Sequence, residues 1–237
     1  RRRAAATALS VVVAGIVLLA AFAVFQRNDA NSKRDEAVSR EIARHMTAYR
    51  LVVEKSTVPV QTGDWVRRTI SENIRPGVEF DVASNPEFLR EGTGIRDFLH
   101  PDRVVIGADD QSAAIRVASL YVGVPAPLMV TDPASAETIK YASNAFLATK
   151  LSFINAVATI CEEVGADVND VVLGMGYDKR IGHDFLRPGP GYGGSCFPKD
   201  TSALVRIAED AGYDFGLLRS AMAVNEEQFD RVAAKIA

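Results

Sequence analysis

The residues from 134 to 164 form the longest helical pattern of this chain, and neither glycine nor proline interrupts them. Apolar residues at helical spacing predict one long helix here. Strand-like and helix-like segments alternate before this stretch, whereas only helical patterns follow it. The stretch therefore predicts a helical spine that joins an α/β part to an all-α part, and a long exposed helix is suited to carry a dimer interface.

The segments before the spine favour a parallel sheet, because strands that alternate with helices are typical of α/β folds. We expect strands at residues 51–58, 78–83, 103–107 and 128–130, and helices at residues 37–49, 63–72 and 111–121. After Asp132 we expect helices at residues 134–164, 167–175, 198–211 and 217–237.

The first residues have a different character. Three arginines precede an uncharged, mostly apolar run at residues 4–25. Such a run is long enough to span a bilayer, and an arginine cluster before it also resembles a signal peptide. The alternative is a buried, alanine-rich helix of a soluble protein. We expect residues 1–36 to form this apolar helix and a polar linker.

Composition and charge argue against some classes of function. The formal net charge is −3 and 24% of residues are charged, so no basic field favours nucleic acid. The two cysteines form no disulfide framework, and the three histidines are scattered without metal-ligand spacing. Low cysteine content is typical of a reducing compartment.

Residues 193–200 carry the strongest chemical signal. Cys196 follows a pair of glycines and precedes a helical pattern. A thiol at a helix start lies near the positive end of the helix dipole, which favours the nucleophilic thiolate. Asp200, four residues on, lies on the same helix face. The alternative is a buried structural cysteine, which is the interpretation we give to Cys161 among its apolar helical neighbours.

Residues 189–194 fit the pattern G-x-G-x-x-G. A dinucleotide fingerprint requires a strand before it and a helix opening within it. No strand precedes these residues, so we interpret them as a mobile substrate loop. The pattern does not recur in the chain.

Residues 193–200 also resemble the active-site signature of the nucleotide-sugar 6-dehydrogenases, the UDP-glucose/GDP-mannose dehydrogenase family. Further segments match that family in order and approximate spacing: residues 55–59, 84–92, 101–107, 139–146 and 177–182. The resemblance runs from about residue 37 to the C-terminus and is strongest to bacterial UDP-glucose members.

This resemblance implies oxidation of UDP-glucose to UDP-glucuronate in two hydride transfers to NAD. Cys196 would trap the aldehyde as a thiohemiacetal, which is then oxidised to a thioester and hydrolysed. GDP-mannose and UDP-N-acetylhexosamine are the other substrates that the family allows. A non-catalytic remnant, tethered to a membrane, is the alternative of a different class.

The resemblance also implies roles for single residues. Lys140 would stabilise the developing alkoxide, and Asn144, one turn further on, would donate to the substrate. The implied catalytic residues are Cys196, Lys140, Asn144, Asp200, Glu87 and Thr57. The implied substrate contacts are Phe88, Leu89, Arg90, Glu91, Tyr192, Gly193 and Arg180, the last reaching the partner subunit. The implied cofactor contacts are Thr57, Glu91 and Lys199. By local chemistry alone, Lys140 and Asn144 could equally be a solvated helix face.

The chain departs from the family at both ends. We expect no likeness over residues 1–36, where the family has its strand and G-x-G-x-x-G turn, and the family's C-terminal nucleotide-sugar domain is missing. Gln61 stands where the family usually has glycine. The expected organisation is thus a partial Rossmann-like NAD-binding domain at residues 37–132 and a central helical dimerisation domain at residues 133–237.

Two further expectations follow. The chain alone should not reduce NAD, because the pyrophosphate turn is missing. The cofactor and substrate favour the cytoplasm and a homodimer, whereas residues 4–25 favour a membrane anchor.

Overall fold

The computed structural model describes residues 33–237. The expected membrane or signal segment at residues 4–25 lies outside the described residues. The chain divides into two compact units. One contains the residues up to Val52 and Thr62–Val82, and the other contains Val53–Gln61 and Ala83–Ala237.

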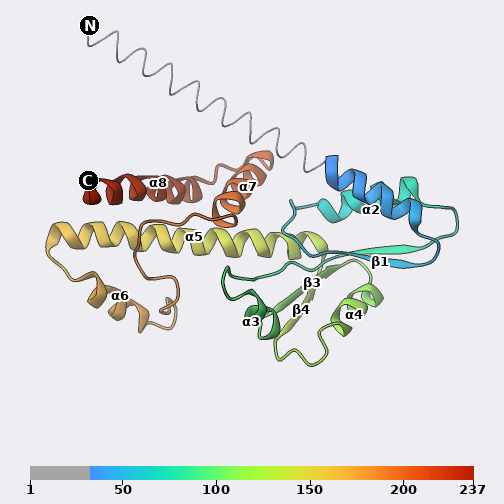
Figure 1. Ribbon diagram of the computed structural model, residues 1–237, viewed down its shortest axis with the longest axis horizontal. Helices are drawn as coiled ribbons and strands as arrows, with labels where there is room; N and C mark the ends of the chain where they lie inside the picture. Colours follow the sequence, from blue (N-terminus) through green and yellow to red (C-terminus); the bar gives the residue numbers. More distant parts are fainter. Residues whose placement is uncertain (1–32) are drawn as a thin grey trace, which may run out of the picture. The chain divides into compact units, whose positions relative to one another are not determined.

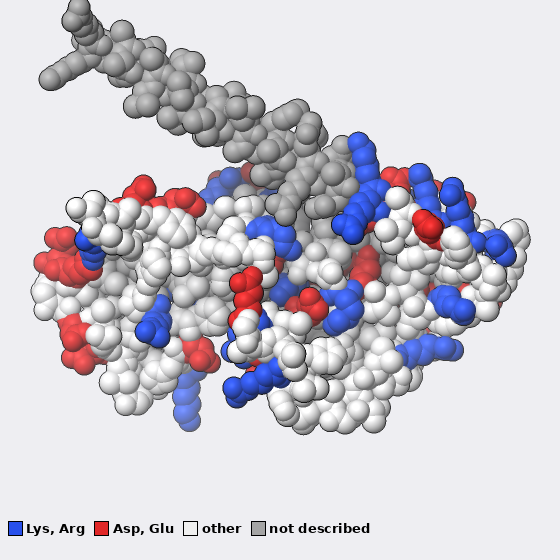
Figure 2. All heavy atoms as spheres, in the orientation of Figure 1, with Lys and Arg blue, Asp and Glu red and all other residues white. Residues whose placement is uncertain are grey.

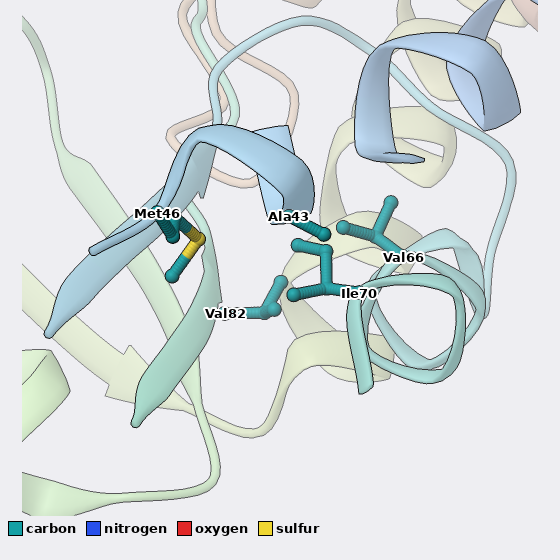
Figure 3. Close-up of a cluster of buried hydrophobic side chains, with 5 residues drawn as sticks. All are labelled: Ala43, Met46, Val66, Ile70 and Val82. Carbon is teal, nitrogen blue, oxygen red and sulfur yellow. The ribbon is translucent and has the colours of Figure 1, made fainter. Parts of the chain in front are cut away.

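The first unit is built on a small apolar core. Helical residues 33–45 and the helix α2 (Thr62–Asn73) each bury one face. The core side chains in Figure 3 come from these helices, from Met46 just after the first helix and from a neighbouring strand, and they are Ala43, Met46, Val66, Ile70 and Val82. Val66 and Ile70 are one helical turn apart, which is why α2 presents both to the same side.

The sheet has four strands in the order β1-β2-β3-β4. They are β1 (Arg50–Glu54), β2 (Phe80–Ser84), β3 (Val104–Ala108) and β4 (Leu128–Thr131). β3 and β4 pair in parallel, as expected, with α4 (Gln111–Ser119) between them in sequence. β2 and β3, however, pair antiparallel through Ala83↔Ala108 and Ser84↔Gly107. Between these two strands the chain has only the short helix α3 (Gly94–Leu99), not a full crossover helix.

The predicted spine is the helix α5 (Pro133–Val164), which agrees with the expected residues 134–164. Its first turn is capped by Asp132, whose side chain accepts a hydrogen bond of 2.8 Å from the Ser135 backbone N–H. Pro133 is at the first helical position, and Gly165 ends the helix at φ +74°. Strong signals at both ends explain why this helix could be predicted from sequence.

Three helices pack on the spine. Figure 1 shows α7 (Phe197–Asp210) and α8 (Gly216–Ile236) on one side of α5, and α6 (Val168–Gly176) on the other. Ala145, Val205 and Leu218 form the core between α5, α7 and α8. At the end of α5, Glu162 pairs with Arg231 and Lys235 of α8. Figure 2 shows acidic side chains gathered at this end, on the left.

β3 packs closely against the start of α5. A Cβ atom on Gly107 would lie 2.6 Å from Ala136 Cβ and 2.7 Å from Pro133 Cα, so only glycine permits this approach. The start of α5 is thereby fixed against the end of β3. This packing places the first turns of α5 beside the loops that follow the strands.

α5 is also the one helix within residues 33–237 that is long and apolar enough to cross a membrane. It contacts α6, α7 and α8, and its buried face includes Glu137, Lys140 and Asn144. A charged, packed face is typical of the core helix of a soluble protein. The length of α5 is therefore weak support for a membrane span.

Candidate active site

Cys196 lies at the N-cap of α7, at the end of the turn of residues 194–196. Gly194 has φ +75°, a conformation that favours glycine, and this brings the chain into the first turn of the helix. The Cys196 carbonyl accepts the Asp200 backbone N–H at 2.9 Å. Cys196 is exposed, which excludes a buried structural cysteine, whereas Cys161 is buried as expected.

Lys140 and Asn144 are each only 7% exposed, so they are not a solvated helix face. Asn144 Nδ2 donates to Asp200 Oδ2 at 2.5 Å. Lys199 Nζ lies 3.0 Å from Asp200 Oδ1. That contact is an ion pair without hydrogen-bond geometry, because Oδ1 is a buried oxygen that lacks a hydrogen bond. Asp200 thus keeps one buried acceptor oxygen, beside Lys199, that carries no hydrogen bond.

The charged groups of this site act on one another. Burial lowers the pKa of the Lys140 ammonium, and the nearby Asp200, Cys196 and Glu87 oppose that shift. An ammonium with a lowered pKa gives up its proton more readily than an exposed lysine does. The structure therefore brings together five of the residues expected to be catalytic, from α5, α7 and the loop after β2.

The Phe88 ring lies near two cations. Its ring centre lies 5.2 Å from Lys140 Nζ and 3.9 Å from the guanidinium carbon of Arg103. Arg103 also donates to Ser143 Oγ on α5 at 3.1 Å. Arg103 thus fixes the loop that carries Glu87 against the spine. Sequence reasoning assigned Arg103 no role, although it lies in one of the matched segments.

Asn85 anchors the same loop at its other end. The side chain is 2% exposed; its Nδ2 donates to the Val105 carbonyl at 2.7 Å. Its Oδ1 accepts from Tyr121 Oη at 2.5 Å. Lys55 Nζ in turn donates to Tyr121 Oη at 3.3 Å. Tyr121 therefore links the loop of Glu87 to the loop that follows β1, which carries the half-buried Thr57. No sequence signal identified Tyr121.

Two arginines expected to bind substrate have partners within the chain. Arg90 donates from its backbone N–H and its Nε to Asp97 Oδ2, at 2.9 and 3.0 Å. Hydrogen bonds from Arg90 lower the pKa of the Asp97 carboxyl. Arg180 is exposed and pairs with Asp178. Arg90 thus stabilises the loop to which it belongs, whereas Arg180 points to solvent.

The loop of residues 189–194 is tethered, although we expected it to be mobile. Asn225 of α8 accepts from the Tyr192 backbone N–H at 2.8 Å and donates to the Tyr192 carbonyl at 3.0 Å. Asn155 of α5 accepts from the Gly189 N–H at 2.8 Å. The Tyr192 side chain is 7% exposed, and burial raises its pKa. Tyr192 therefore belongs to the core, while Gly193 beside it is exposed.

Comparison with known proteins identifies the family. Residues 134–227 match the central domain of the UDP-glucose/GDP-mannose dehydrogenase family. Residues 22–124 match the NAD-binding domain of the same family. The chain belongs to the UDP-glucose/GDP-mannose dehydrogenase family. The second match begins at residue 22, inside the segment for which we expected no likeness.

Individual relatives agree with this family. The chain is 52% identical to the UDP-glucose 6-dehydrogenase YwqF of Bacillus subtilis (strain 168), over 86% of this chain and 47% of the relative. It is 45% identical to a UDP-glucose 6-dehydrogenase of Rhizobium meliloti (strain 1021), over 96% of this chain and 53% of the relative. A UDP-glucose dehydrogenase structure from Pyrobaculum islandicum is 46% identical, with a TM-score of 0.78 over 81% of this chain and 45% of that chain. The chain thus spans about half the length of the curated relatives it matches.

The NAD-binding domain match gives NAD as the cofactor of this dehydrogenase family domain. The loops after β1 and β2, with Thr57 and Glu91, leave the sheet at its strand ends, where α/β sheets bind ligands. Within residues 33–237, however, the one G-x-G-x-x-G lies in the tethered loop before α7, not between a strand and a helix. Among the described residues, the loops after β1 and β2 are therefore the candidates for contacts with the cofactor.

Proposed function

We propose that the protein containing this chain oxidises UDP-glucose to UDP-glucuronate, with NAD as the hydride acceptor of both oxidations. One observation carries the proposal: Cys196 lies exposed at a helix start beside buried Lys140, Asn144 and Asp200. The names of the relatives that are 52% and 45% identical, both UDP-glucose 6-dehydrogenases, support UDP-glucose as the substrate.

The first oxidation needs a group that stabilises negative charge on the sugar C6 oxygen. Lys140 is suited to this role, because its ammonium is buried and its pKa is lowered by that burial. Asn144 holds Asp200 in place, and Oδ1 of Asp200, buried beside Lys199, has no hydrogen bond and can accept one from a substrate hydroxyl that enters the site. The C6 alcohol would lose its proton to water and its hydride to NAD, and the product is the aldehyde.

The second oxidation uses Cys196. The thiolate attacks the aldehyde carbon and forms a C–S bond, and the resulting thiohemiacetal loses a hydride to become a thioester. Glu87 then takes a proton from a water, whose oxygen attacks the thioester carbon, and the thiolate leaves. Thr57 would share this water. The open Cys196 side chain gives room for the covalent intermediate.

Substrate and cofactor contacts would surround this centre. Exposed Leu89 and Gly193 would contact the sugar, and Thr57, Glu91 and Lys199 would contact NAD. Phe88 would form one side of the sugar site, beside Lys140. Because UDP-sugars and NAD are cytosolic metabolites, the protein would act in the cytoplasm.

The partner would be a second copy of the chain. Phe146, Phe153 and Ile160 are 68%, 55% and 58% exposed on α5. Their seven-residue spacing places them on one stripe of the helix. A homodimer through α5 would cover this stripe, and solvent-facing Arg180 would reach the partner's site.

The test is Cys196→Ser in the natural protein that contains this sequence. With UDP-glucose and NAD, the unaltered protein should form two NADH per sugar, and the variant should be slower by about three orders of magnitude or more. Cys161→Ala is the matched control, because Cys161 is buried in α5. An unchanged rate in Cys196→Ser would exclude the thioester route.

A further inference from the structure

Ser195 stands between the nucleophile and a carboxylate. Its Oγ donates to Glu91 Oε1 at 3.1 Å and lies 3.6 Å from Cys196 Sγ, within hydrogen-bond range for sulfur. The adjacent Gly194 is close to Glu91 as well: a Cβ atom there would lie 3.7 and 3.8 Å from the two carboxylate oxygens. Glu91, Ser195 and Cys196 thus form a short chain of polar atoms.

A hydroxyl has one hydrogen to donate. If Ser195 gives it to the Glu91 carboxylate, only a lone pair of Oγ faces the sulfur, and that lone pair accepts the thiol hydrogen. If Ser195 turns its hydrogen to the sulfur, it stabilises the thiolate and releases Glu91. A hydrogen bond to an ionised acceptor is about twice as strong as one to a neutral acceptor, so the charge on Glu91 decides between the two arrangements.

We propose that Ser195 is a catalytic residue that couples the charge of Glu91 to the ionisation of Cys196. While Glu91 is ionised, Ser195 holds the thiol form. When a ligand or a proton neutralises Glu91, Ser195 turns to Cys196 and the thiol proton passes to water. Only the S–H bond breaks, so the step needs no oxidant. The inference rests on the proposed function, because it specifies when the nucleophile of that reaction is released.

Other charges also act on Cys196. Lys140 of α5 interacts with Cys196, Glu87 and Asp200, and Lys199, on the same helix as Cys196, pairs with Asp200. Charges at these positions act through space. The effect of Glu91 proposed here differs from theirs because it requires the Ser195 hydroxyl.

A double-mutant cycle on this chain separates the two effects. The rate of Cys196 alkylation by iodoacetamide is measured between pH 6 and 10 in the unaltered chain, Glu91→Gln, Ser195→Ala and the double variant. Because Cys161 is buried, Cys196 is the reactive thiol. We expect Glu91→Gln to raise the rate at pH 7 by about three- to tenfold when Ser195 is present. With Ser195→Ala, we expect a gain of less than about twofold.

Equal gains in both backgrounds would show a through-space charge effect and overturn the proposal, as would no gain in either. Ser195→Thr keeps a hydroxyl and should retain the coupling; behaviour like Ser195→Ala would also overturn it. Ser202→Ala is the matched control, because Ser202 is an exposed serine of α7 that bonds the Pro198 carbonyl. Circular dichroism checks that these exposed positions leave the fold intact. Alkylation needs neither NAD nor sugar, so its failure leaves the Cys196→Ser turnover test independent.

Discussion

At the scale of single residues, the members of the candidate site could be named from the sequence, but the residues that support them could not. Cys196, Lys140 and Asp200 belong to continuous motifs, and the structure confirms that they lie together. Arg103 and Tyr121 act through contacts with residues far away in sequence. Such contacts exist only after the strands and helices have assembled, so no local pattern reports them.

Tyr121→Phe tests one of these supports. The change removes the donor to Asn85 Oδ1, which is buried and would lose its hydrogen bond. An unsatisfied buried polar atom costs about 1–3 kcal/mol. Urea denaturation should therefore show a free energy of unfolding lower by about that amount. Tyr177→Phe is the control, since Tyr177 is 73% exposed. Equal stability of the two variants would contradict this role of Tyr121.

At the scale of elements, local sequence signals predicted both ends of α5, but they did not predict the direction of every strand in the sheet. The helix has a capping aspartate, a proline at its first position and a glycine at its end, and each can be read from the sequence. The direction of β2 against β3 depends on how the chain between them returns. That path depends on side-chain contacts inside the connection, such as the Arg90–Asp97 pair, and not on strand periodicity.

The Asp132 cap predicts a pH dependence. Hydrogen bonds from Ser135 lower the pKa of the Asp132 carboxyl in the folded chain. The stabilisation from its charge is therefore present above the unfolded pKa of about 3.9 and is lost as the pH falls through the lower folded value. At pH 7, Asp132→Ala should lower the melting temperature by about 2–4 °C.

Asp132→Asn is the matched variant, because asparagine also caps helices but carries no charge. At pH 7 it should melt between the unaltered chain and Asp132→Ala, and its difference from the unaltered chain should shrink as the pH falls below the unfolded pKa of about 3.9. Thermal unfolding followed by circular dichroism at several pH values measures this. A difference that stays constant with pH would contradict a role for the charge.

At the scale of the whole molecule, the exposed stripe of α5 predicts self-association. Phe153→Glu places a charge in the middle of the stripe and should convert a dimer to a monomer in sedimentation velocity experiments. Val122→Glu is the control, because Val122 is 85% exposed and lies outside α5. A dimer that survives Phe153→Glu would place the interface elsewhere.

The length of α5 allows a movement at one end of the helix to reach the other end. Lys140 and Ile160 are on the same unbroken helix, and at 1.5 Å per residue they are about 30 Å apart. A rigid rod of that length turns a tilt of about three degrees at one end into a movement of about 1.5 Å at the other. Displacements of about 1 Å are enough to slow an enzyme markedly. A partner that moves the far end of α5 would therefore also move the Lys140 ammonium at the near end.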